Sequence, residues 1–114
     1  MEARDLRDLV HFDDTGPRHE TLFESDRLWS EVVCLDRNQS LGPISDFDSD
    51  AIVLVVAGKV VVQLDRSRKR RDQWETALVP AGAELTITNA TGEGAVVLIV
   101  AAPPPPRRPA VTDP

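Results

Sequence analysis

Two short runs of aliphatic residues constrain the fold of this chain more than any other feature. Residues 52–56 read IVLVV and residues 95–101 read AVVLIVA. Alternate side chains of a strand point to opposite faces of a sheet, so both faces of such strands have to be covered. In a small barrel the inner face meets the lumen. The outer face then needs a second layer, either the N-terminal segment or a second subunit, and we therefore expect a homodimer.

The rest of the chain reads as short strands separated by turns. About seven strands with turn residues every eight to twelve positions are typical of an all-β sandwich or barrel. Leu6, Leu9 and Val10 have helical spacing and predict a short helix over residues 2–10. Residues 38–43 read as a turn. We expect an N-terminal helix or arm over 1–19, a barrel over 20–102 and an extended, proline-rich tail over 103–114.

Composition narrows the choice of partners and compartment. The 114 residues are 41% hydrophobic, as expected of one globular domain, and carry a net charge of -6. This charge disfavours nucleic acid and anionic membranes as partners. No signal peptide is evident, and the longest apolar run is far shorter than the roughly 20 residues of a membrane-spanning helix. The single cysteine, Cys34, excludes an intrachain disulfide and fits a cytoplasmic location.

Residues 41–102 resemble the small single-domain cupins. The resemblance rests on turn and strand residues of two half-motifs: Gly42-Pro43, the strand 52–58 with its closing glycine, Pro80-Ala81-Gly82 and Asn89. The glycine that usually opens the second half-motif is replaced by Trp74. The resemblance implies an antiparallel, jelly-roll-like β-barrel.

The same resemblance shows which chemistry is missing. The positions of the three metal-binding histidines and the glutamate fall on Ile44, Asp46, Leu85 and Ala51, and a one-residue slip would put Ser45 and Phe47 there instead. A catalytic metal needs about three converging protein ligands, and a single carboxylate does not provide them. We therefore expect no metal and no cofactor, and the metal-dependent activities of the family do not transfer.

Three functional hypotheses remain open. In the first, the protein is a non-catalytic module whose lumen binds a small apolar or amphipathic ligand, or it serves as a dimeric scaffold; the expected pocket residues are Ile44, Asp46, Ala51, Val53, Val55, Leu85 and Ile87. In the second, it is a metal-independent isomerase or cyclase with Asp46 as general base, assisted by His11 or His19. In the third, the basic run 66–71 or the proline-rich tail makes it an accessory subunit that binds another protein.

Each remaining candidate residue has a simpler interpretation that we prefer. The basic run 66–71 reads as a solvated hairpin tip or edge that discourages aggregation. Asp46, Asp48 and Asp50 lack the glycine and the distal glutamate of a calcium loop. Cys34 is expected to be an inert core residue, and the tryptophans at positions 29 and 74 to be packing residues.

Overall fold

The computed structural model describes residues 1–45 and 48–105, so the predictions that fall on Asp46, Phe47 and the tail from residue 106 lie outside the described residues. The described part contains one short 3-10 helix, η1 (Leu6–Leu9), and nine strands. The strands are β1 (Arg18–Glu24), β2 (Trp29–Leu35), β3 (Ser40–Ile44), β4 (Asp50–Ala57), β5 (Lys59–Leu64), β6 (Ser67–Asp72), β7 (Thr76–Val79), β8 (Leu85–Thr88) and β9 (Ala95–Ala102).

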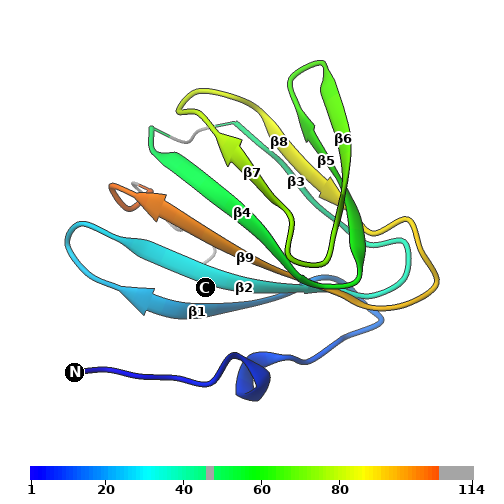
Figure 1. The fold of residues 1–114 in the computed structure, drawn as a ribbon, viewed down its shortest axis with the longest axis horizontal. Coiled ribbons are helices and arrows are strands. Elements are labelled where there is room, and N and C mark those ends of the chain that lie inside the picture. Colours follow the sequence, from blue (N-terminus) through cyan, green and yellow to red (C-terminus); the bar gives the residue numbers. More distant parts are fainter. Residues whose placement is uncertain (46–47, 106–114) are drawn as a thin grey trace.

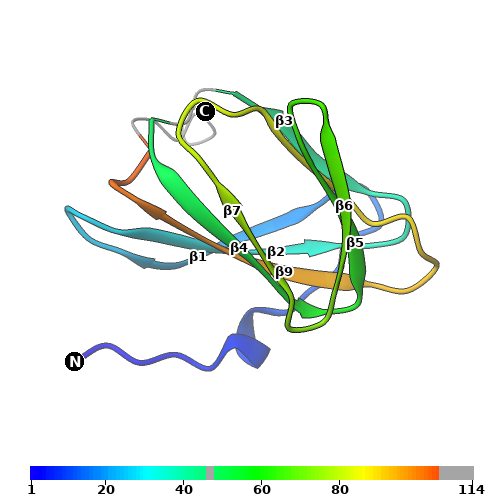
Figure 2. The ribbon, with the colours of Figure 1, turned by 45° about the horizontal axis from the view of Figure 1, so that its top comes forward.

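The strands form two facing antiparallel sheets, as Figures 1 and 2 show. The five-stranded sheet has the order β1-β2-β9-β4-β7 and the four-stranded sheet the order β3-β8-β5-β6. The expected all-β, antiparallel, jelly-roll-like architecture is confirmed. Strands β6 and β7 are each the last strand of their sheet, so the barrel is not closed by hydrogen bonds between them.

The main core lies between the sheets and comes from alternate residues of the two apolar runs. Val53 and Val55 of β4 and Val97 of β9 are fully buried, and they pack with Leu85 and Ile87 of β8. Strands β4 and β9 are neighbours in the five-stranded sheet, with Val53 opposite Ile99. The buried side chains of one strand therefore lie directly beside those of the next.

A second cluster covers part of the outer face of the five-stranded sheet. Leu9 of η1 packs there with Val32, Cys34 and Val96, so the N-terminal segment is the second layer for this part of the sheet. The predicted helix over 2–10 is only the turn Leu6–Leu9, because Asp5 and Val10 on either side of it have extended backbones. Among the described residues, no helix is long and apolar enough to span a membrane.

Strand β3 runs through residues that the sequence predicts to be a turn. Ser40 and Leu41 pair with β8, the ladder is interrupted, and pairing resumes at Ile44. The interruption accommodates Gly42-Pro43. Gly42 has a φ of 101°, and a Cβ at this position would overlap the carbonyl oxygen of Leu85. Glycine is thus required here because β3 and β8 approach closely, and the breaker residues mark an irregularity within a strand.

Candidate functional site

Three of the four residues that the motif resemblance puts at metal-ligand positions, Ile44, Ala51 and Leu85, belong to or pack against the main core. Ile44 of β3 is directly opposite Leu85 of β8. Ala51 of β4, between Val79 and Ala101, belongs to the same cluster. Leu85 is fully buried, Ala51 is 1% exposed, and Ile44 packs against the cluster from its rim. The fold therefore brings three of the four positions into one cluster, and Asp46 is outside the described residues.

These residues do not fit a metal ion. The side chains of Ile44, Ala51 and Leu85 carry no donor atom, and a divalent cation requires nitrogen, oxygen or sulfur ligands. In residues 1–45 and 48–105, no group of three or more histidine, cysteine, aspartate and glutamate side chains is placed to hold one.

Six of the seven expected pocket residues belong to or pack against the main core, and the seventh, Asp46, lies outside the described residues. Val53, Val55, Leu85 and Ile87 are each 0% exposed. Three surface hollows stand out in the described part of the chain, and their linings include none of the expected pocket residues. One lies at the ends of β4, β5 and β6 beside the 91–93 turn, one lies against residues 3–7, and the third is a slot of about 340 Å³ between β6 and β7. Sequence analysis missed the slot.

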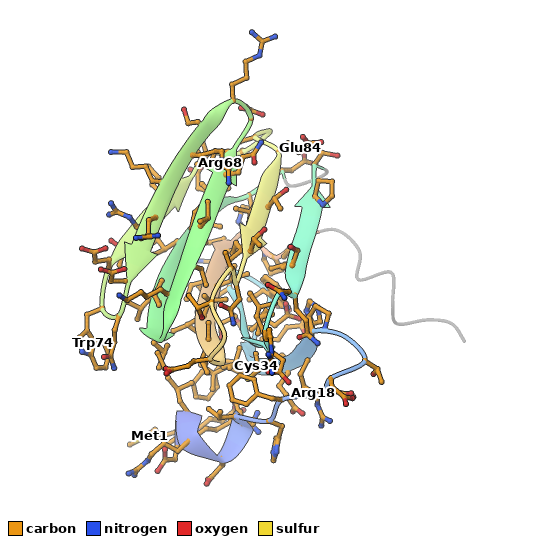
Figure 3. All side chains as sticks on the ribbon, turned by 90° about the vertical axis from the view of Figure 1, so that its right-hand side faces the viewer. Met1, Arg18, Cys34, Arg68, Trp74 and Glu84 are labelled. Atoms are coloured by element: carbon orange, nitrogen blue, oxygen red, sulfur yellow. The ribbon has the colours of Figure 1, made fainter. Side chains whose placement is uncertain are left out.

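Neither the histidines nor the cysteine lie in the barrel interior: His11 and His19 are exposed, and Cys34 packs in the second cluster, between the five-stranded sheet and the N-terminal segment. His11 is exposed, and no pair between it and His19 is found among the described residues. His19 Nδ1 of β1 is 3.1 Å from Glu31 Oε1 of β2. Its pKa is raised by the hydrogen bond to Glu31, against the opposing effect of burial. Cys34 is buried beneath the N-terminal segment (Figure 3), and burial raises the pKa of its thiol.

Asn89, one of the motif residues, has a structural role that is visible in its hydrogen bonds. Its side chain is fully buried at the end of β8. Nδ2 donates to the carbonyl oxygens of Leu35, Asp36 and Glu93 at 3.0, 3.2 and 2.7 Å. Oδ1 accepts from the backbone N and the hydroxyl of Thr91 at 3.0 and 2.8 Å. Asn89 thus joins the end of β2 to the turn between β8 and β9.

Trp74 explains why the second half-motif usually opens with glycine. Its φ is 74°, in the left-handed region where residues with a side chain are strained. Its side chain is 69% exposed and projects from the β6–β7 turn (Figure 3). Trp74 therefore does not pack in the core of this chain, whereas Trp29 is buried, and packing of Trp74 at an interface stays a prediction.

The basic run forms the edge strand β6, and its charges divide between the two faces of the sheet. In the β5–β6 ladder, Lys69 is opposite Val62 and Arg70 is opposite Val61. Val62 is buried in the main core, so Lys69 is on the inner face and Arg70 on the outer one. The same alternation puts Arg71 on the inner face. The alternation of side chains along a strand predicts that these charges divide between two faces, but the face that each one takes depends on the register with β5.

The fold matches many solved structures of cupin proteins. A protein from Thermus thermophilus, TT1209, superposes with a TM-score of 0.86 and 26% identity over 90% of this chain and 98% of that one. An RmlC-like cupin from Desulfovibrio desulfuricans superposes with a TM-score of 0.82 and 21% identity, covering 91% of this chain and 98% of that one. A Klebsiella pneumoniae protein with a double-stranded β-helix domain superposes with a TM-score of 0.83 and 13% identity, covering 90% of each chain. No protein-family model and no curated protein matches the sequence. The chain has a cupin fold, and the resemblance inferred from the motifs is confirmed at this level.

Proposed function

We propose that this protein is a metal-free cupin-fold module that binds a small ligand rather than catalysing a metal-dependent reaction. The observation that carries the proposal is the apolar cluster of Ile44, Ala51 and Leu85 at the positions that correspond to metal ligands in the cupin half-motifs. Asn89 and Gly42 retain the structural part of those motifs. The supporting frame is thus retained while the donor atoms are replaced by carbon.

Metal analysis of protein purified without chelators tests the negative half of this proposal. We expect less than about 0.1 equivalent of iron, zinc, manganese, nickel or cobalt, as apolar side chains do not coordinate them. The matched control is the triple variant Ile44→His, Ala51→Glu and Leu85→His, which restores ligands at three of the four half-motif positions, two of them opposite each other across β3 and β8. Zinc or nickel retained by the variant alone would support the proposal. Stoichiometric metal in the unmodified protein would refute it.

A thermal-shift screen with small apolar and amphipathic compounds tests the positive half. A ligand that binds only the folded protein at 100 times its Kd stabilises it by about 2.7 kcal/mol. Such a shift would support binding. If no compound among a broad set shifts the midpoint, the role as a dimeric scaffold is favoured instead.

The outer face of the five-stranded sheet supports a homodimer as the working form. Ile52 of β4 and Leu78 of β7 are cross-strand neighbours and are 50% and 65% exposed. Leu54 and Val100 adjoin them and are half-buried. The N-terminal segment packs over the other part of this face and leaves these four residues uncovered within the described part of the chain. A two-fold axis through such a patch would bury it against itself.

Light scattering coupled to size exclusion tests the homodimer. We expect a dimer at micromolar concentration and a monomer for Leu78→Lys, because the substitution places like charges at a self-complementary apolar contact. Gln63→Lys, on the outer face of the four-stranded sheet, makes the same charge change away from the patch and should remain dimeric. A monomeric unmodified protein would contradict the homodimer without affecting the ligand-binding proposal.

A further inference from the structure

The slot between β6 and β7 combines an apolar floor with a positively charged side. Its apolar lining comes from both sheets and consists of Val62, Leu64, Ala77 and, at the rim shared with the patch of the proposed homodimer, Leu78. Val62 belongs to the main core, and Leu64 and Ala77 pack against it. The floor of the slot is therefore continuous with the main core. The slot lies where the two sheets end in the edge strands β6 and β7, which face each other in the view of Figure 2.

The polar lining consists of donors and, among the described residues, includes no carboxylate. Ser67, Lys69 and Arg71 line the slot from β6, and Thr76 lines it from β7. Lys69 has no ion-pair partner among residues 1–45 and 48–105. Arg71 is half-buried; its Nε donates to the Arg70 carbonyl oxygen at 2.8 Å and is 3.9 Å from Glu75 Oε1. Two cations thus face an apolar floor in a chain whose net charge is -6.

This arrangement is specific to one face of β6. Arg68 and Arg70 lie opposite Gln63 and Val61 on the outer face of the sheet and do not line the slot. Each face of β6 carries two cations, and only the inner pair, Lys69 and Arg71, stands beside the apolar lining of the slot. Lys69 and Arg71 are opposite the buried residues Val62 and Val60. Beside such apolar side chains, a bound anion would form charge-assisted hydrogen bonds with the two cations and offset the cost of removing them from water.

We infer that the slot between β6 and β7 binds a small organic carboxylate with an apolar body. The body would lie on Val62, Leu64 and Ala77, and the carboxylate would accept hydrogen bonds from Lys69 and Arg71. A volume of about 340 Å³ is at the lower end of the range for small-molecule sites, which fits a compact ligand. The inference rests on the proposed role as a ligand-binding module, but it puts the ligand at the sheet edges instead of in the barrel interior.

Titration of the ¹⁵N-labelled, full-length protein with octanoate tests the inference, with octan-1-ol as the uncharged probe of the same length. We expect octanoate to shift the amide signals of β6 and β7 and to bind at least about tenfold more tightly than octanol, because a charge-assisted hydrogen bond contributes about 1.5–3 kcal/mol and 1.4 kcal/mol is a factor of ten. Equal binding of the two probes would overturn the role of the cations.

A pair of matched variants separates the site from general charge attraction. Lys69→Gln and Arg68→Gln remove the same charge from adjacent residues of β6, one facing the slot and one facing away. At about 0.15 M salt, where the screening length is about 8 Å, we expect Lys69→Gln to weaken octanoate binding about tenfold and Arg68→Gln less than twofold. Similar effects of the two variants, or no binding of octanoate at all, would overturn the inference.

The same titration distinguishes this inference from the proposed function. Shifts confined to β4 and β8 around Val53 and Ile87 would put the ligand in the barrel interior, which would overturn the slot and support the proposed function. Stoichiometric metal together with octanoate shifts in β6 and β7 would refute the metal-free proposal and leave the slot supported.

Discussion

Asn89→Ala is expected to destabilise the protein by about 3 kcal/mol, and the figure follows from the hydrogen bonds of one buried amide. The Asn89 side chain makes contacts of 2.7–3.2 Å with Leu35, Asp36, Thr91 and Glu93. Its two N–H hydrogens are shared by three carbonyl oxygens, and its oxygen accepts two bonds. Four hydrogen bonds at about 1 kcal/mol each give about 4 kcal/mol. Thr91 is half-exposed and can bond to water instead, which recovers about 1 kcal/mol.

Urea unfolding followed by tryptophan fluorescence measures this loss, since Trp29 is buried and becomes exposed on unfolding. With a slope of about 2 kcal/mol per molar urea, the midpoint should fall by about 1.5 M. Asn89→Asp keeps the size of the side chain but turns its two donors into an acceptor facing three carbonyl oxygens. It should therefore cost at least as much as the alanine variant.

Gln73→Ala provides the matched control. It removes the same chemical group, but Gln73 is exposed and donates one hydrogen bond, to the Val56 carbonyl oxygen at 3.1 Å. We expect this variant to lose less than about 1 kcal/mol. If Asn89→Ala also lost less than about 1 kcal/mol, or if Asn89→Asp were as stable as the original protein, the view of Asn89 as a tie between β2 and the β8–β9 turn would be refuted.

Three further predictions concern single residues. Trp74→Gly should stabilise the protein by up to about 1.5 kcal/mol, because relief of a left-handed backbone gains about 1–2 kcal/mol and the added chain entropy costs about 0.5–1 kcal/mol; a lower urea midpoint would mean that the indole makes a stabilising contact. The pKa of His19 is raised by Glu31 above its ordinary value of 6.5, so the stability from this pair should be complete below that pH and be lost as the pH rises through the folded-state pKa. Glu31→Gln should flatten this dependence in urea titrations between about pH 5 and 8.5, and an unchanged slope would contradict it. The Cys34 thiol should react with a disulfide reagent only at the rate of unfolding, because it is 1% exposed and burial raises its pKa; fast reaction in the native state would show that the N-terminal segment opens.

The sequence predicts the central strands β4 and β9 well because their side chains are apolar on both faces. The apolar runs 52–56 and 95–101 become β4 and β9, which extend beyond them by one or two residues at their ends. Asn89 and Gly42 were recognised as motif residues, and the structure supplies their physical roles.

The features that sequence analysis missed depend on long-range geometry. Residues 38–43 contain the usual breakers, so nothing local indicated that β3 passes through Gly42-Pro43 beside Leu85. The slot exists because β6 and β7 end their sheets without pairing, and strand order is not encoded in the local pattern. The composition of the basic run was plain from the sequence, but the face on which each charge lies depends on its register with β5.

That register has a consequence for comparing this protein with others of similar sequence. Ser67 follows Leu64 across a hairpin of only two residues, Asp65 and Arg66, and Asp65 has a φ of 52°. Because side chains alternate along a strand, one inserted or deleted residue in this hairpin would exchange every inward charge of β6 for an outward one. Two chains could then carry identical numbers of arginines and lysines and yet offer an anion entirely different surroundings, so the length of this hairpin is a better criterion for shared ligand preference than the charge of the strand that follows it.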